Sequence, residues 1–258
     1  MENKFTKMKN EQNAIHDLKY EMSFIDVLSS ISNINDEVII KKSEDKKFIN
    51  IKGNDDKTHI LYTIDAPVKY FNFKGDEMGI ISFKKMNQYL NTYITKESQP
   101  FIKTSQDIDG QPEYIYINSS TIQSKITHKL GFIDVMRKPC FKSISSGNKD
   151  TAIKLSIGQI QQLKKMTNLI EASDIKFIVN GDICNIALSN PKRYDNFEQS
   201  YPNEVEAETP FKLTVLPTGI ELMPVANYEV NIDKEGLVHF HQIREDEIDI
   251  NFYLMERA

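Results

Sequence analysis

A pattern that occurs twice along the chain constrains the fold more than any other feature of the sequence. Met22-Ser23-Phe24 in the first half corresponds to Leu155-Ser156-Ile157 in the second, and each triplet is typical of a strand end, a capping serine and a first helical residue. Short β-branched and aromatic segments follow each helix, and a further strand, a helix and three strands complete each half. The sequence therefore predicts an α+β fold of two duplicated domains with antiparallel sheets.

Serine residues mark the expected starts of the helices. Ser23 precedes apolar residues at i, i+3, i+4 and i+7, and Asp26 stands where a capping box has its acid. Ser82 precedes a second amphipathic segment in the same half. In the second half, Ser156 and Gln159 have the spacing of a regular capping box. These positions predict short helices with one buried face.

Changes in composition divide the chain into segments. Residues 1–16 are polar and rich in Lys and Asn, which indicates a flexible N-terminal arm. The segment 129–150 contains proline, glycine and several serines and interrupts the rhythm of strands, as an interdomain connector does. We therefore expect the first domain at 17–128 and the second at 151–258.

The composition excludes several classes of protein. Of the 258 residues, 40% are hydrophobic and 27% are charged, as in a globular chain. No apolar run is long enough to span a membrane, and the first residues lack the apolar core of a secretion signal. Two cysteines are too few for a disulfide scaffold or a zinc site of four thiolates. We expect a cytoplasmic protein without a membrane partner.

Several strings resemble one known family. IKLSIGQIQQLKKM at Ile153–Met166 and FKLTVLPTGIELMPVANYEVNI at Phe211–Ile232 are similar to the C-terminal domain of the T-even phage type of sliding clamp, the processivity factor of DNA polymerase. FNFKGDEMGIISF at Phe71–Phe83 and the strand pair around Ser105–Gly110 resemble the first domain of that family. The likeness covers most of residues 20–257, through pattern and short strings.

The resemblance implies a sliding-clamp fold, in which antiparallel sheets form the outside of a ring and short helices line a central channel. It implies a homotrimer that encircles double-stranded DNA without reading its sequence and tethers the replicative DNA polymerase. An ATP-driven clamp loader is implied as a partner, because a closed ring must be opened onto DNA. The family has no catalytic activity and no cofactor, and the expected location is the cytoplasm of a phage-infected bacterium.

Two expected helices carry polar faces that fit such a channel. A sliding protein needs attraction to phosphates without base contacts, and flexible Lys, Gln and Asn side chains provide it. No acid occurs in 82–93 or in 157–170, although the chain has 37 acids against 32 bases and a net charge of −5. The candidate DNA-binding residues are Lys164, Lys165, Lys84, Lys85, Gln161, Gln162 and Asn168. An ordinary solvated helix surface explains these lysine pairs as well.

The first expected helix does not share this pattern. Its polar face holds Asp26 and three serines but no cation, and Lys19 just before it is expected to compensate. The acids gather instead at 204–208 and 245–249, where an outer wall would repel stray DNA. Ordinary solubility charge is the alternative explanation for these acids.

The expected connector combines apolar and basic residues. In clamps generally, partner peptides dock an apolar anchor beside the connector and the second domain, and adaptable Met residues suit several partners. We expect Ile133, Met136 and Met223 to contribute to partner binding. The alternative is that these residues only tie the connector to a sheet.

Two other functions remain open at this point. His239 and His241 lie two residues apart on an expected strand and therefore point to the same side, so a β-barrel metalloenzyme could use them as ligands. A trimeric β-rich phage structural protein that does not bind DNA also fits the acidic balance and the short strands. The acid-free helical faces favour the clamp, because a structural protein has no need of them.

Overall fold

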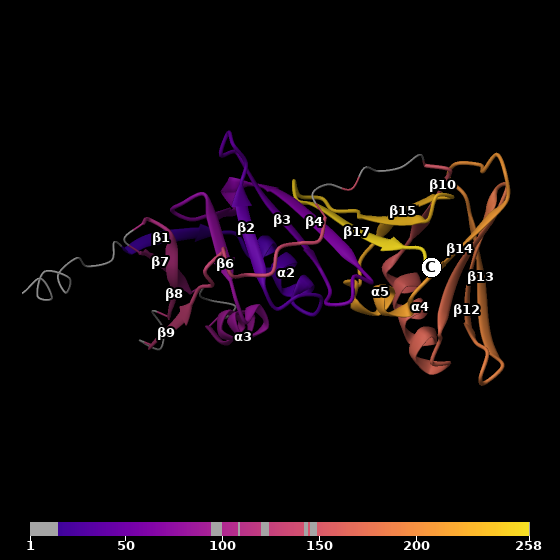
Figure 1. Cartoon of the computed structure of the whole chain (residues 1–258), viewed down its shortest axis with the longest axis horizontal. Helices are drawn as coiled ribbons and strands as arrows, with labels where there is room; N and C mark the ends of the chain where they lie inside the picture. Colours follow the sequence, from indigo (N-terminus) through magenta and orange to yellow (C-terminus); the bar gives the residue numbers. More distant parts are fainter. Residues whose placement is uncertain are drawn as a thin grey trace, which may run out of the picture. The chain divides into compact units, whose positions relative to one another are not determined.

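The computed structural model describes residues 15–93, 100–107, 109–119, 124–141, 144 and 149–257 (Figure 1). By its contacts the chain forms two compact units. The first unit contains the residues up to 32, 36–51 and 67–138, and the second contains 33–35, 52–66 and 139–258. None of the described helices is long and apolar enough to cross a membrane.

The observed units and first strand differ from the expected limits at three places. Residues 33–35 and 52–66, which were expected in the first domain, belong to the second unit. Strand β1 (Ile15–Tyr20) begins at Ile15, so residues 15 and 16 of the expected arm belong to a sheet. Residues 1–14 lie outside the described residues. Contacts of the first unit continue to residue 138, which includes the first part of the expected connector.

A five-stranded antiparallel sheet with the strand order β5-β1-β7-β8-β9 is the main layer of the first unit. Its other strands are β5 (Phe71–Asn72), β7 (Phe101–Gln106), β8 (Pro112–Ser119) and β9 (Ser124–Lys129). Leu18, Ile102, Ile115 and Ile117 are buried on one face, and the alternate residues point to the opposite face. In a smaller ladder, β2 (Val38–Lys42) pairs with β3 (Phe48–Asn54) on one side and with β6 (Glu77–Ile80) on the other. The short 3-10 helix η1 (Val68–Tyr70) directly precedes β5.

The first helix of this unit, α2 (Met22–Ile31), buries the predicted apolar face but starts differently. Its N-cap is Glu21, and no side chain caps it, so the prediction that Ser23 caps this helix is wrong. The backbone N–H of Glu21 donates to the carbonyl of Tyr70 at 2.8 Å. The strand β1 therefore runs directly into the helix, and Ser23 lies inside the first turn.

The second helix, α3 (Phe83–Tyr93), follows Ser82 as predicted. Asp36 supplies its N-terminal contacts from a distant loop. The N–H of Phe83 donates to the carbonyl of Asp36 at 2.8 Å, and the N–H of Lys84 donates to the Asp36 carboxylate at 2.9 Å. A carboxylate at this end also interacts favourably with the helix dipole.

The second unit contains two antiparallel ladders, one with the order β13-β12-β11-β14. Its strands are β11 (Asp174–Asn180), β12 (Ile183–Asn190), β13 (Asp195–Pro202) and β14 (Phe211–Val215). The other ladder consists of β10 (Thr151–Leu155), β15 (Tyr228–Asp233), β16 (Leu237–Gln242), β17 (Asp249–Met255) and β4 (Leu61–Pro67). Buried aromatic rings of Phe177 and Phe240 connect the two ladders, with 6.5 Å between the ring centroids. Within the second ladder, the centroids of Tyr228 and Phe240 lie 5.8 Å apart.

The helices of the second unit are α4 (Ile157–Leu169) and α5 (Pro217–Leu222), which contact each other. The predicted capping box is confirmed: Ser156 Oγ accepts from the N–H of Gln159, and Gln159 Oε1 accepts from the N–H of Ser156 at 2.7 Å. Asn227 Oδ1 accepts a further N–H, that of Ile157, at 2.9 Å. Three of the free N–H groups at this end of α4 are therefore satisfied by side chains.

Candidate nucleic-acid interface

The exposed face of α4 brings together most of the residues predicted from the second half. Gln161, Gln162, Lys165 and Asn168 are all exposed on this helix, at spacings that place them on one side. The helix contains no acid. Its open face therefore presents one ammonium group and three neutral polar side chains, which suits contact with phosphates and gives no sequence readout.

Lys164 is placed differently from its neighbour Lys165. Its ammonium group donates to the carbonyl of Glu221 at 3.0 Å and to the carbonyl of Met223, at the C-terminal end of α5. The side chain is half-buried, and this burial lowers the pKa of Lys164, while the nearby Glu221 carboxylate opposes the shift. Lys164 thus caps α5, and its cation does not lie on the open face of α4.

The exposed face of α3 carries both of its predicted lysines. Lys84, Lys85, Gln88 and Asn91 are exposed, and the helix has no acid in its first turn. The contact of Lys84 with Asp36 uses the backbone N–H, and the ammonium of Lys85 lies 5.7 Å from the centre of the Tyr89 ring. Both cations extend from the helix surface.

Lys19 does not join the helical faces. Within β1 and β5, Lys19 pairs with Asn72 and the adjacent Tyr20 pairs with Phe71. The ring of Phe71 packs against Phe24 of α2, with 5.3 Å between the centroids. Because successive strand residues point to opposite faces, Lys19 points away from α2 and does not compensate for its missing cation.

Two of the three predicted partner-binding residues are buried. Met223 is 1% exposed at the end of α5, and Met136 is 6% exposed. Met136 packs where Gly79 of β6 bridges Gly131: a Cβ added at Gly131 would lie 2.7 Å from Met136 Sδ, and one at Gly79 would overlap it. Met136 therefore ties the start of the connector to the sheet, which is the structural alternative considered from the sequence.

Other residues of the same segment are available at the surface. Ile133 is half-buried, whereas Val135 is 82% exposed and Phe132 is 58% exposed. The ammonium of Lys129 lies 5.6 Å from the centre of the Phe132 ring. The apolar side chains that a partner could contact in this segment are thus Phe132 and Val135.

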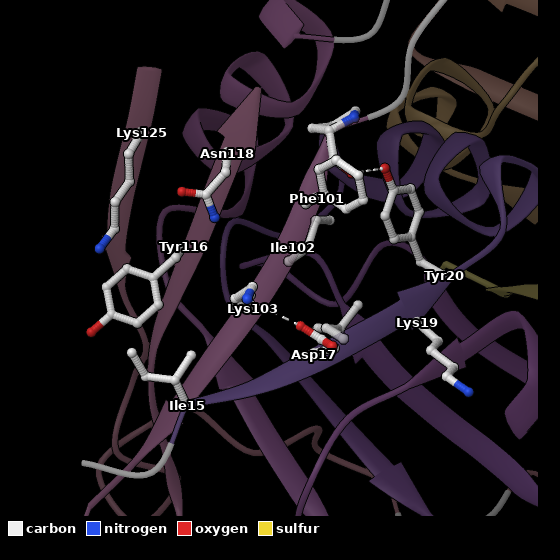
Figure 2. A pocket seen from close by; sticks show the side chains of 12 residues that line it. Ile15, Asp17, Lys19, Tyr20, Phe101, Ile102, Lys103, Tyr116, Asn118 and Lys125 are labelled. Carbon is white, nitrogen blue, oxygen red and sulfur yellow. Dashed lines mark hydrogen bonds and ion pairs between the residues drawn. The ribbon is translucent and has the colours of Figure 1, made fainter. Parts of the chain in front are cut away.

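A groove of about 990 Å³ crosses the five-stranded sheet on the face opposite α2 (Figure 2). Side chains that line it include Asp17, Lys19, Phe101, Lys103, Tyr116, Asn118 and Lys125. The lining contains three lysines and one acid, a local charge of 3 − 1 = +2 in a chain of net charge −5. The sequence analysis did not predict this groove, because its lysines lie on different strands. The available signals were Phe101 and Lys103 two residues apart on β7, and Tyr114 and Tyr116 two residues apart on β8.

Comparisons with known proteins decide the fold. No protein-family model and no curated protein matches the sequence. The crystal structure of Proliferating Cellular Nuclear Antigen from Entamoeba histolytica matches with a TM-score of 0.73 at 14% identity, over 96% of this chain and 100% of that chain. A chain in the structure of the C-terminal region of FEN-1 bound to A. fulgidus PCNA matches with a TM-score of 0.70 at 10% identity, over 95% and 99%. The chain has the sliding-clamp fold. The predicted α+β clamp fold is thereby confirmed.

The acidic clusters of this clamp-fold chain are partly paired with bases. Glu204 lies 2.9 Å from the ammonium of Lys154. Arg244 donates two hydrogen bonds to the carboxylate of Asp246, at 2.7 and 2.5 Å, and these bonds hold the pKa of Asp246 below its usual value. In each acidic cluster a neighbouring base therefore offsets part of the negative charge. The placement of these clusters on an outer wall stays a prediction.

The two histidines considered as metal ligands have other contacts in the clamp fold. His239 stacks on Tyr253 with 4.7 Å between the ring centroids, and its Nε2 lies 2.7 Å from Asn251 Oδ1. His241 Nε2 lies 3.1 Å from the carboxylate of Asp249. Within the described ranges, no three His, Cys, Asp or Glu residues gather as metal ligands would.

Proposed function

We propose that this chain is a sliding clamp of the T-even phage type, a DNA polymerase processivity factor that acts as a ring around double-stranded DNA. It binds DNA without sequence specificity and tethers the replicative DNA polymerase, and an ATP-driven clamp loader opens the ring. It works without catalysis or a cofactor, in the cytoplasm of a phage-infected bacterium. The observation that carries the proposal is the sliding-clamp fold over the whole chain.

The exposed cations of α3 and α4 support the DNA-binding part of this proposal. Lys84, Lys85 and Lys165 extend from acid-free helices in a chain with an excess of acids. Their flexible ammonium groups attract phosphates, while the neighbouring amides make weak, exchangeable contacts. A clamp held by few such contacts slides, and enclosure rather than affinity keeps it on DNA.

Two edge strands support closure into a homotrimer. Strand β9 is an edge of the five-stranded sheet, and β13 is an edge of the four-stranded sheet. Edge strands have unpaired backbone groups that a second chain can pair with. Strand β9 contains Lys125 and Lys129 and no acid, whereas β13 contains Asp195 and Glu198 and no base. We propose that β9 of one subunit pairs with β13 of the next, a head-to-tail contact that closes as a ring.

The connector supplies the proposed contact with the polymerase. A. fulgidus PCNA is bound to the C-terminal region of FEN-1 in the matching structure. We propose that partner segments of this kind dock on the exposed Phe132 and Val135, with Ile133 at the base of the contact, instead of on the buried Met136 and Met223.

The deciding experiment combines mass with DNA topology. Light scattering on the free protein is expected to give three times the chain mass of 29.8 kDa. After loading, the protein is expected to stay on nicked circular DNA and to leave the same DNA once it is cut to a linear form. A trimer that is never retained on circular DNA would instead indicate a structural protein, and a stable monomer would contradict the ring.

A further inference from the structure

The groove on the first unit is organised as a row of four side chains that crosses four strands. Leu18 of β1 is opposite Ile102 of β7, so the next step of this register brings Lys19 opposite Phe101. Phe101 pairs with Asn118, and Asn118 pairs with Lys125 of β9. The row therefore has a lysine at each end and Phe101 and Asn118 between them (Figure 2).

The two end lysines are the cations of the groove that an added partner can neutralise. Asp17 and Lys103, in the neighbouring row, form an ion pair of 3.4 Å. Within the described part of the chain, Lys19 has no acidic partner, and the Lys125 ammonium lies 4.0 Å over the ring of Tyr116. Phe101 between them is 62% exposed, a large apolar surface that is open to solvent. The row thus offers cation, apolar surface and cation in order.

The spacing of this row defines the partner. Three strand-to-strand steps separate Lys19 from Lys125, roughly 14 Å at about 4.8 Å for each step. An extended peptide covers about 13 Å in four residues, and its residues i, i+2 and i+4 point to the same side. We propose that the groove docks an extended acidic segment of a partner protein, with acids at i and i+4 on Lys19 and Lys125 and an apolar residue at i+2 on Phe101.

The same observations disfavour single-stranded nucleic acid. Proteins that bind single strands combine a continuous basic track with free aromatic faces for base stacking. Here the Tyr116 ring is covered by Lys125, and the exposed acid Asp17, paired with Lys103 at 3.4 Å, interrupts the basic track. An extended peptide needs no continuous track, because its two carboxylates contact cations only at the two ends of the row.

Fluorescence anisotropy with two labelled peptides tests the proposal on the full chain. The peptide GSDTLTDSG has acids at i and i+4 around a leucine, and GSTDLDTSG has the same composition with the acids only two residues apart. We expect the first peptide to bind at least about tenfold more tightly. Lys19→Glu with Lys125→Glu is expected to weaken it by roughly tenfold or more, and Phe101→Ser by severalfold.

The control variant Lys192→Glu with Lys212→Glu makes the same charge change at exposed positions of the second unit and is expected to leave binding unchanged. Lys125 lies on a sheet edge, so Lys125→Glu could change the oligomer mass that light scattering measures. In that case the single variant Lys19→Glu replaces the double variant as the test. Equal binding of both peptides, or no binding up to about 1 mM, overturns the proposal. It is also overturned if the groove variant loses affinity for a labelled oligothymidylate and not for the peptide.

Discussion

The helices α3 and α4 carry the same sequence signal, an adjacent pair of lysines on an acid-free helix, yet they use it differently. In α3 both cations, Lys84 and Lys85, extend into solvent. In α4 only Lys165 does so, because the ammonium of Lys164 is bound to carbonyls at the end of α5. Adjacent helical residues are about 100° apart around the axis, so a neighbouring element can capture one lysine and leave the other free.

This difference shows that two adjacent lysines on a helix do not necessarily share one role. The short helix α5 ends beside α4, and its last carbonyls need donors. In the first unit, Asp36 instead serves the N-terminal end of α3 and uses backbone N–H groups, which leaves the lysine side chains available. We therefore expect α3 to contribute about twice as much DNA attraction as α4.

The largest expected effect comes from neutralising the α3 pair. For each subunit in contact with DNA, Lys84→Gln with Lys85→Gln should reduce the log–log salt slope of binding by about 1.8, against about 0.9 for Lys165→Gln. The same double change should weaken binding roughly fiftyfold per such subunit at 0.1 M salt. Titrations of duplex DNA at several salt concentrations measure both values. Lys164→Gln is the matched control and should leave the slope unchanged; equal slope changes at Lys164 and Lys165 would make the two α4 lysines equivalent.

The next effect concerns stability at the α4–α5 contact. Lys164→Met keeps most of the apolar stem but removes the donor to the carbonyls of Glu221 and Met223, so unfolding should become easier by about 1–2 kcal/mol. Urea denaturation followed by circular dichroism measures this change. Lys165→Met, one residue away and exposed, should change stability by less than about 0.5 kcal/mol. A larger effect at Lys165 than at Lys164 would refute the capping role.

The helix starts offer a third comparison between the units. Ser156→Ala removes one acceptor of the α4 capping box and should cost about 1 kcal/mol of unfolding free energy. Ser23→Ala in α2 should cost less than about 0.5 kcal/mol, because Ser23 caps nothing. Thermal and urea unfolding of the two variants side by side check this order. If Ser23→Ala proved the more harmful change, the start of α2 would have to be reassigned.

The smallest effect is a pH dependence from one histidine in each unit, the buried His128 and the partly buried His239. Burial lowers the pKa of His128 and of His239 from the usual 6.5. Below pH 6.5 the unfolded chain therefore binds protons that the folded chain refuses, so stability falls as pH falls, by no more than about 1.4 kcal/mol per pH unit for each group. His128→Gln and His239→Gln should each flatten the loss between pH 6.5 and 5.5. An unchanged pH profile in both variants would contradict this.

Local patterns in the sequence predict a large part of the fold. Apolar spacing in α2 and α4 gives their buried faces, and the pair Ser156 and Gln159 gives the start of α4, because these contacts involve only neighbouring residues. The strings at Ile153–Met166 and Phe211–Ile232 give the clamp resemblance. The predicted start of α2 at Ser23 is wrong because the N–H of Glu21 is bound to the carbonyl of Tyr70, a residue far away in the sequence, and the helix begins directly after Glu21.

The candidate site is less predictable, since contacts with residues far away in the sequence decide which of its side chains stay exposed. Nothing near Lys164 indicates that α5 ends beside it, and nothing near Met136 shows the glycine bridge on which it packs. The prediction that Lys19 compensates for the missing cation of α2 is wrong, because the sequence gives the alternation along the strand but not which face of the sheet meets α2. The groove needs the register of β1, β7, β8 and β9, which no single segment encodes.

The contact of Met136 with Gly79 and Gly131 links three positions through their volumes. A methyl group gained at Gly79 would also lie 2.8 Å from the carbonyl oxygen of Gly131, and one gained at Gly131 would lie 2.6 Å from Ile81 Cγ2. A smaller residue at position 136 alone therefore makes room for neither change. Related sequences should keep both glycines even where the residue at 136 varies, because backbone and a second side chain limit the space as well as Met136 does.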